Sequence, residues 1–173
     1  MFFVVKKTVK PSIEKVFLGW LGKGRTLPQA QNNIEAINMG KRIEEITRLL
    51  DELEVRFELK EETIVALWKT EKWENLVVNF IFSPNEIWLT IVGWQKFPEL
   101  SETDAAEFYK KLLAESWNYN GVKYCLDPDG DLAVVVETAD MEISKEELSR
   151  YIRQVLNAAD EMYDWVPIEA WTE

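Results

Sequence analysis

The sequence predicts an α+β domain with the element order α-β-β-β-α-β-β-α, in which helices pack on one face of a five-stranded antiparallel sheet and an N-terminal arm precedes the domain. Three observations support this prediction. Three segments combine helix-capping residues with apolar residues at spacings of three and four, which is typical of amphipathic helices. Between these segments lie short runs of β-branched and aromatic residues, which favour strands. The stretch Asp127-Pro-Asp-Gly-Asp131 has the turn chemistry of a hairpin between the last two runs.

The first helix is predicted over residues 26–54. Thr26 can cap it, Pro28 suits its first turn, and Gln29 occupies the capping-box position. Gly40 is a point at which the segment can bend or divide into two helices. The apolar stripe of this helix consists of Met39, Ile43, Ile46, Leu50 and Leu53.

The second and third predicted helices begin at serine caps. Ser101 precedes Asp104, an acid at the third helical position, and Ser144 forms a full capping box with Glu147. The apolar face of the second helix consists of Phe108, Leu112, Leu113 and Trp117. The third helix extends to about Trp165, and its core stripe consists of Leu148, Ile152, Val155, Leu156, Ala159 and Met162.

The five strands are predicted over residues 63–69, 75–83, 86–94, 122–126 and 132–138. The first three form a meander and the last two form the hairpin. In the third strand, Leu89 and Ile91 point to one face, whereas Trp88, Val92 and Trp94 point to the other. Because the helices cover one face only and monomers rarely expose such a patch, the Trp88 face is predicted to be an interaction surface, covered by the arm or by a second copy of the chain.

The charge distribution separates an arm, residues 1–25, from a domain, residues 26–173. Residues 1–30 contain six basic residues and one acidic residue, a net charge of +5, while the remaining 143 residues carry −16. Either the arm docks on its own domain, which we favour, or it binds an acidic partner. The aromatic residues that can dock are Phe2, Phe3, Phe17 and Trp20, and the basic residues expected to touch an acidic surface are Lys6, Lys7, Lys10 and Arg25.

Composition excludes several classes of function. A net charge of −11 disfavours binding to nucleic acids and to anionic membranes. No apolar stretch approaches the roughly 20 residues of a spanning helix, and the lone Cys125 cannot form an internal disulfide, so a cytoplasmic location is expected. The chain contains no histidine, which rules out Ser-His and Cys-His nucleophile pairs and histidine-based zinc sites.

Two stretches resemble ligand-binding motifs, but neither matches the full pattern of its motif. The loop from Gly19 to Thr26 is one residue short of a phosphate-binding loop, because Arg25 occupies the lysine position and no parallel strand is predicted before it. The acidic stretch from Asp127 to Asp131 lacks the spacing of an EF-hand, because Leu132 follows where glycine is needed and Thr138 stands at the closing glutamate position. No cofactor and no metal are therefore predicted.

With these features, the chain resembles the YbjN-like family of sensory transduction regulators over about residues 41–166. The resemblance rests on the element order, on Asp129-Gly-Asp-Leu132 followed by Ala133 to Glu137, and on Ser144-x-Glu-Glu-Leu148. It implies the fold of type III secretion chaperones, which act as homodimers, hold extended segments of client proteins and use no nucleotide. It also implies that there are no catalytic residues, and the basic arm is a departure from the family's compact pattern.

The sequence therefore predicts a non-enzymatic protein-binding module, chaperone-like or regulator-like, that recognises a protein segment as a homodimer. The residues predicted to form its binding surface are Trp88, Val92, Trp94 and Trp117, together with Lys6, Lys7, Lys10 and Arg25 of the arm. The alternative is a metal- or nucleotide-dependent enzyme that uses acidic residues and the loop from Gly19 to Thr26.

Overall fold

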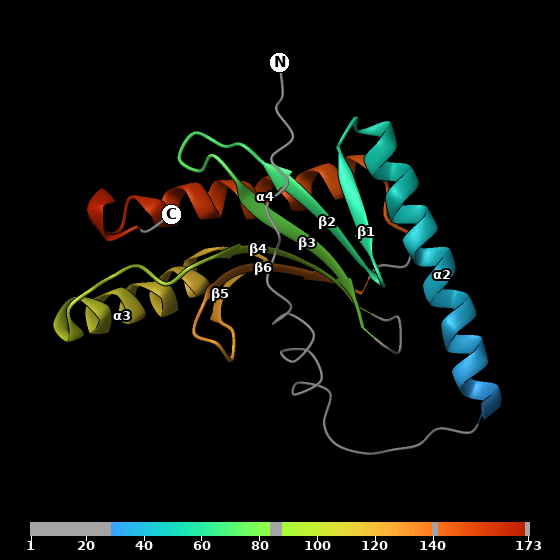
Figure 1. The fold of residues 1–173 in the computed structure, drawn as a ribbon, viewed down its shortest axis with the longest axis horizontal. Helices are drawn as coiled ribbons and strands as arrows, with labels where there is room; N and C mark the ends of the chain where they lie inside the picture. The colour runs from blue at the N-terminus through green and yellow to red at the C-terminus, as the bar shows by residue number, and fades with distance from the viewer. Residues whose placement is uncertain (1–28, 84–87, 140–141, 172–173) are drawn as a thin grey trace.

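The computed structural model of the chain describes residues 29–83, 88–139 and 142–171, with side chains from residue 40 onward. Within these ranges the helices are α2 (Gln29–Glu52), α3 (Glu102–Asn118) and α4 (Lys145–Tyr163), followed by a 3-10 turn, η1 (Ile168–Ala170). The strands are β1 (Phe57–Lys60), β2 (Thr63–Trp68), β3 (Leu76–Phe82), β4 (Leu89–Gln95), β5 (Val122–Leu126) and β6 (Leu132–Thr138). This is an α+β fold with an antiparallel sheet and three α-helices in the described part of the chain (Figure 1).

The sheet has six strands, in the order β1-β2-β3-β4-β6-β5, so the prediction of five strands was wrong. The missed strand is β1, whose sequence Phe-Glu-Leu-Lys carries two charges and is mostly exposed. It pairs with β2 in a hairpin in which Glu61 has a φ of 54°, within the left-handed region. The strand β1 does alternate apolar and charged residues, but it is an edge strand of four residues, mostly exposed and without a β-branched side chain, so its pattern is a weak signal for a strand.

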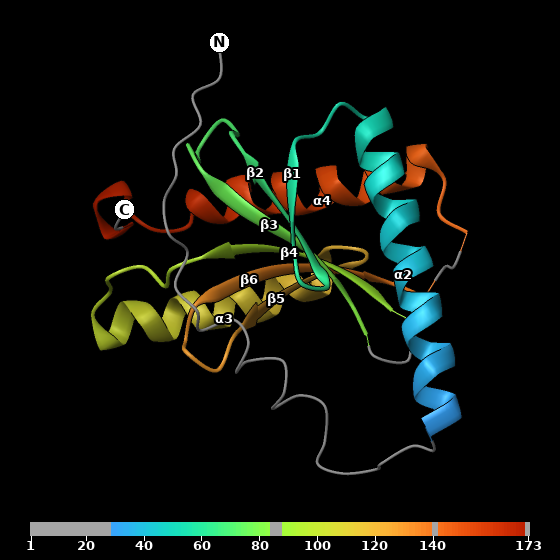
Figure 2. The same ribbon diagram turned by 45° about the vertical axis from the view of Figure 1, so that its right-hand side comes forward.

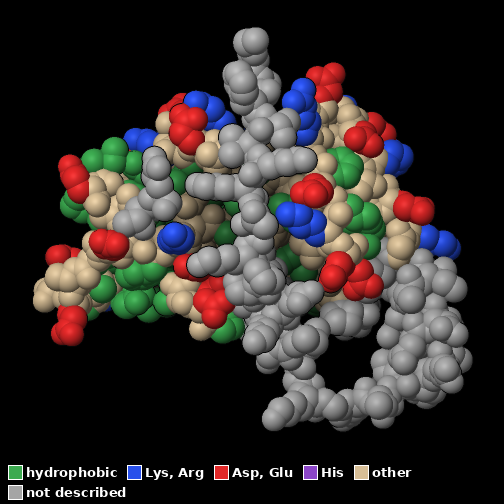
Figure 3. Space-filling view, in the orientation of Figure 1, with side chains coloured by type: hydrophobic (Ala, Val, Ile, Leu, Met, Phe, Trp, Pro, Cys, Tyr) green, Lys and Arg blue, Asp and Glu red, His purple; other side chains and the backbone are tan. Residues whose placement is uncertain are grey.

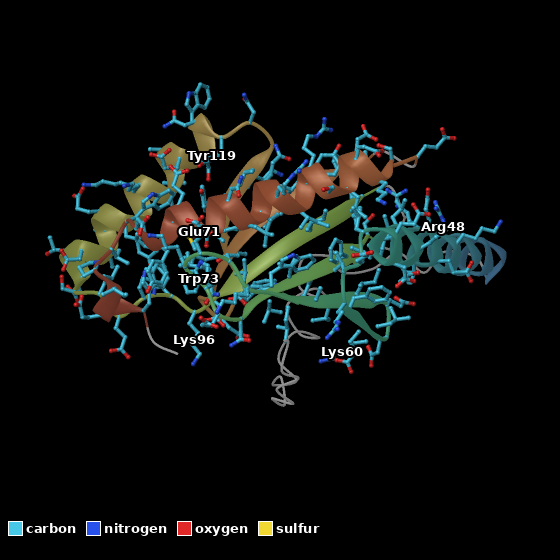
Figure 4. All side chains as sticks on the ribbon, turned by 90° about the horizontal axis from the view of Figure 1, so that it is seen from above. Arg48, Lys60, Glu71, Trp73, Lys96 and Tyr119 are labelled. Atoms are coloured by element: carbon cyan, nitrogen blue, oxygen red, sulfur yellow. The ribbon has the colours of Figure 1, made fainter. Side chains whose placement is uncertain are left out.

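One face of the sheet, which we call the inner face, carries the main core. The helix α4 runs along this face, behind the sheet in Figure 1 and above it in Figure 4. Phe80, Ile91 and Val134 of the sheet and Leu148 and Val155 of α4 all belong to this core. Gly93 lets the helix approach closely, because a Cβ atom there would lie 2.9 Å from Cγ1 of Val155.

The helix α4 begins as the sequence predicts. Ser144 accepts a hydrogen bond from the backbone N–H of Glu147, and the Glu147 carboxylate accepts one from the backbone N–H of Ser144 at 3.0 Å. Its predicted stripe is buried except at Leu156, which is half-buried. The helix α2 passes through Gly40 without a break, and its residues Ile46, Leu49 and Leu50 join the main core.

The helix α3 begins at the predicted cap, Ser101, but buries a narrower face than expected. Phe108 and Leu112 are in the core, whereas Leu113 and Trp117 are exposed. Each residue advances about 100° around a helix, so Leu113 and Trp117 lie on a face turned away from the one that Phe108 and Leu112 bury. The prediction that all four residues form one buried face was therefore wrong.

The hairpin between β5 and β6 is confirmed. Oδ1 of Asp127 accepts hydrogen bonds from the backbone N–H groups of Asp129 and Asp131, at 2.9 and 2.8 Å. Gly130 has a φ of 88°, which an L side chain rarely adopts. No helix in the described ranges is long and apolar enough to cross a membrane.

Candidate functional site

The opposite face of the sheet, which we call the outer face, has no described helix over it (Figures 1 and 2). Its centre is a second, smaller cluster of buried side chains, contributed by β3, β4 and β6, with Trp94 packed at its edge. The buried members are Ile81, Val92, Ala133 and Val135. The outer face thus combines an apolar centre with the absence of a described covering element.

Two polar groups lie beside this apolar centre. Asn79 of β3 is fully buried, at 0% exposure, and pairs in register with Val65 of β2 and Val92 of β4. Neither atom of its side-chain amide has a hydrogen-bond partner, and the buried indole N–H of Trp94 has none either. A buried polar group without a partner costs about 1–3 kcal/mol, so these two groups weaken the outer face as a permanent core.

Larger side chains surround the centre of the outer face. Trp88 is 46% exposed, and the hairpin end beside it is held by a hydrogen bond of 3.1 Å from its backbone N–H to the Ser83 hydroxyl. Leu67 of β2 is exposed as well. On the far side, Lys123 forms an ion pair with Glu137. An apolar surface with a partly exposed tryptophan and a polar border resembles a protein-binding patch in composition.

A second exposed apolar surface follows α3. Tyr109, Leu113 and Trp117 are spaced by four residues, so they lie in one row along the helix, and we call them the α3 stripe. Leu113 is 73% exposed and Trp117 is 89% exposed. Apolar side chains over α3 are visible at the lower left of Figure 3. The helix packs beside β5, an edge strand whose backbone pairs only with β6 among the described strands, and Leu126 of β5 is also exposed.

A groove of about 820 Å³ separates α3 from the C-terminal segment. Phe108 and Trp165 contribute to its apolar walls, and a hydrogen bond of 2.7 Å from the Glu99 N–H to the Ala170 carbonyl ties its two sides together. Acidic side chains outnumber basic ones among its lining residues, which include Glu99, Asp104, Glu107, Glu169, Lys110 and Lys111. The Lys111 ammonium lies 5.0 Å from the Trp165 ring, a cation–π distance.

The C-terminal wall of this groove is fixed by aromatic packing. The rings of Tyr163 and Trp171 stack with centroids 5.6 Å apart, and Trp73 meets both rings edge-on. The indole N–H of Trp73 donates to the Ala159 carbonyl at 3.1 Å. Figure 4 places Trp73 and its neighbour Glu71 beside the end of α4. The loop between β2 and β3 therefore anchors the segment that follows α4.

The predicted binding residues fall into three groups. Val92 and Trp94 belong to the outer face, and Trp88, which directly precedes β4, continues their alternation. Trp117 belongs to the α3 stripe. The basic residues Lys6, Lys7, Lys10 and Arg25, and the loop from Gly19 to Thr26, lie outside the described residues. Sequence reasoning missed Asn79 as a buried group and Tyr109 and Leu113 as surface residues. A helical wheel centred on Phe108 and Leu112 could have identified the α3 stripe.

The described residues offer little for catalysis. They contain no group of three or more His, Cys, Asp or Glu side chains that could hold a metal ion. Cys125 is exposed as a residue, but its thiol is partly desolvated, which raises the pKa of the thiol and disfavours the reactive thiolate. Burial, followed by the charge of Asp127, raises the pKa of Asp131, but both carboxylates belong to the hairpin turn.

The fold matches solved structures at low sequence identity. YbjN of E. coli, described as "a putative transcription regulator", matches with 14% identity and a TM-score of 0.54, over 69% of this chain and 87% of that one. A chain of the ExsC–ExsE complex matches with 14% identity and a TM-score of 0.56, over 72% and 96%. A chain of the heterodimeric ExoU–SpcU complex from the type III secretion system of Pseudomonas aeruginosa matches with 13% identity and a TM-score of 0.52, over 70% and 97%.

No curated protein matches the sequence. The sequence matches the YbjN family, described as "Putative bacterial sensory transduction regulator", over residues 42–167. These residues make up most of the described part of the chain. The match and the predicted resemblance cover nearly the same residues. The chain belongs to the YbjN family and has the fold of type III secretion chaperones.

Proposed function

We propose that this protein is a non-enzymatic, cytoplasmic protein-binding module, chaperone-like or regulator-like, that recognises a segment of a client protein as a homodimer. The α3 stripe carries the proposal, because a tryptophan that is 89% exposed beside a leucine that is 73% exposed is costly unless a partner covers them. Two of the matching structures, the ExsC–ExsE and ExoU–SpcU complexes, are complexes between proteins.

In this proposal the α3 stripe contacts a second copy. A two-fold axis near α3 would bring the stripe of one subunit against the stripe or the β5 edge of the other, which is the self-complementary arrangement of a symmetric dimer. Leu126 on β5 extends the apolar surface beyond the helix. Tyr109 contributes a ring already packed against Phe97 at 5.1 Å, so it loses little freedom on association.

The outer face is the proposed site for the client segment. An extended peptide supplies apolar side chains for Val92 and Trp88 together with backbone amide groups. Asn79 can donate to a carbonyl and accept from an N–H, and the Trp94 indole can donate to a carbonyl. A client segment would therefore satisfy the two groups that have no partner in the described structure.

Light scattering tests the dimer. The full chain should have twice the monomer mass of 20.3 kDa, and Trp117→Glu should reduce it to the monomer mass, because a buried unpaired carboxylate is unfavourable. Asn118→Glu is the matched control, since it adds the same charge at the next exposed position, outside the stripe. A dimer that survives Trp117→Glu would contradict this interface.

Photo-crosslinking in cells tests the client site. A photoreactive phenylalanine analogue at position 88 should crosslink to a polypeptide of different sequence, identified by mass spectrometry. The same analogue at position 157, which is exposed on α4 away from the outer face, should not capture it. Equal capture at both positions, or capture of this chain alone, would contradict the client site.

The metal- or nucleotide-dependent enzyme is the less favoured candidate. It would require the loop from Gly19 to Thr26 to hold phosphate, although Arg25 replaces the lysine of that motif. Thermal unfolding with magnesium, with and without a nucleotide, distinguishes the two functions, because a ligand that binds only the folded state raises Tm. We expect no change.

A further inference from the structure

We propose that the chain's own N-terminal arm, residues 1–25, docks on the outer face when no client is bound. The inference rests on the proposed function, because the client that competes with the arm is the one proposed there. The described residues that carry it are the outer-face cluster, Asn79 and Trp94.

The first argument is the burial of the outer face. Val92 and Ala133 are only 3% and 4% exposed, although no described helix crosses this face. On the inner face, comparable burial is produced by α4, whose side chains pack directly on the strands. A single layer of strands leaves the side chains of a bare face partly in water, so the outer face requires a cover that the described elements do not supply.

The second argument is the composition of the arm. Its apolar residues can replace the contacts that a helix makes on the inner face, since buried aromatic side chains contribute most to such contacts. They include Phe2, Phe3, Val4, Val5, Val9, Ile13, Val16, Phe17, Leu18 and Trp20. Residues 1–30 carry +5 against −16 on the remainder, so the long-range field of the body attracts the arm.

The third argument is reach. Twenty-eight residues precede Gln29, the first residue of α2. An extended chain spans roughly 3.3 Å per residue, so 25 residues reach about 80 Å. Six strands spaced about 4.8 Å apart make a sheet roughly 30 Å across. The arm is therefore long enough to return from the start of α2 and cross the whole outer face.

Asn79 and Trp94 make this cover replaceable. Neither group has a hydrogen-bond partner among the described residues, so each is available to a segment that approaches the outer face. A client segment that forms hydrogen bonds with the Asn79 amide and the Trp94 indole can therefore compete with the arm. The tethered arm has the advantage of a high effective concentration, so only a client with those extra contacts displaces it.

Cys125 provides a probe in the full chain. It is the chain's single cysteine, it is exposed, and it pairs in register with Ala133 of the outer-face cluster. A nitroxide attached to Cys125 should broaden the NMR amide signals of residues 2–20 in the same molecule, when labelled chains are diluted into an excess of unlabelled ones. Replacing Phe3 and Phe17 by Asp should restore those signals.

The matched control moves the label to the other side of the sheet. A chain with Cys125→Ser and Asn157→Cys carries the nitroxide on α4, and there the arm signals should remain sharp. Equal broadening from both label positions, or none from Cys125, would overturn the proposal. Broadening seen only when isotope-labelled chains are mixed with separate nitroxide-labelled chains would also overturn it, because the occupant would then be a second copy. None of these results changes the readouts of the other tests, which are a dimer mass by light scattering and capture of a polypeptide of different sequence at position 88. A failure of this inference is therefore distinguishable from a failure of the proposed function.

Discussion

The two faces of the sheet are built from the same strands but have different interiors. On the inner face, Ile91 and its neighbours lie in one continuous core with side chains from α2, α3 and α4. On the outer face, a cluster of four buried side chains adjoins Asn79, which is paired with Val92 of that cluster and whose amide has no hydrogen-bond partner among the described residues. In the inner core the Tyr124 hydroxyl donates to the Ala158 carbonyl, and a core whose polar group is paired suits a permanent cover. A centre with unsatisfied polar groups suits a cover that is exchanged. The inner face therefore carries the fold, and the outer face is available for function.

Adjacent residues on β4 test this comparison most strongly. Ile91→Ala should reduce the free energy of unfolding by about 2–5 kcal/mol, because it leaves a cavity in the main core. Val92→Ala, one residue away on the outer face, should cost about 1 kcal/mol, because fewer atoms are lost from a smaller cluster. Chemical denaturation of both variants measures the difference. Equal losses would mean that the two faces are cores of the same kind.

A substitution at Gly93 tests how closely the inner face fits α4. Gly93→Ala should cost about 1–3 kcal/mol through overpacking, because the new Cβ would lie 2.9 Å from Cγ1 of Val155. Gly40→Ala is the control, since nothing lies within 4 Å of a Cβ at that position. On an exposed helix it should stabilise the protein by up to about 1 kcal/mol. A neutral Gly93→Ala would show that α4 can shift from the sheet without cost.

Replacing the buried amide of Asn79 should increase the stability of the protein, whereas the substitutions at Ile91, Val92 and Gly93 should reduce it. Asn79→Leu should raise the free energy of unfolding by about 1 kcal/mol, because it removes a desolvated group that has no partner. The same variant should weaken client capture at position 88. Asn79→Asp is the contrasting variant, since burying a carboxylate there should destabilise the protein. Thermal and chemical unfolding measure both, and a destabilised Asn79→Leu would show that the amide has a partner in solution.

The cap of α4 gives the smallest expected effect and one that depends on pH. The backbone N–H of Ser144, and then its hydroxyl, hold the pKa of Glu147 below its ordinary value. Because the pKa is lower in the folded state, the stabilisation is fully present above the unfolded-state pKa and is lost as pH falls through the folded-state pKa. Glu147→Gln should therefore flatten the loss of Tm on acidification, whereas Glu146→Gln, with the same change of charge, should not. Parallel slopes for both variants would contradict the capping role of Glu147.

Local chemistry determined much of this protein. Ser101 and Ser144 start α3 and α4 where their capping patterns place them, and the turn from Asp127 to Asp131 joins β5 to β6. These signals can be predicted because each depends on hydrogen bonds within a few residues of the chain. The family followed from the same local patterns in their order along the chain.

The tertiary structure decided which surfaces are covered. The edge strand β1 depends on the backbone ladder that β2 offers, because its four mostly exposed residues are by themselves a weak signal for a strand. The apolar residues of α3 divide into a buried pair and an exposed stripe according to which side of the helix faces the core, and that choice depends on residues far away in the sequence. Trp88, Val92 and Trp94 share a face by alternation alone, but only the packed strands enclose Asn79 among them. Burial depends on all the neighbours of a side chain at once, and most of those neighbours are brought together by folding.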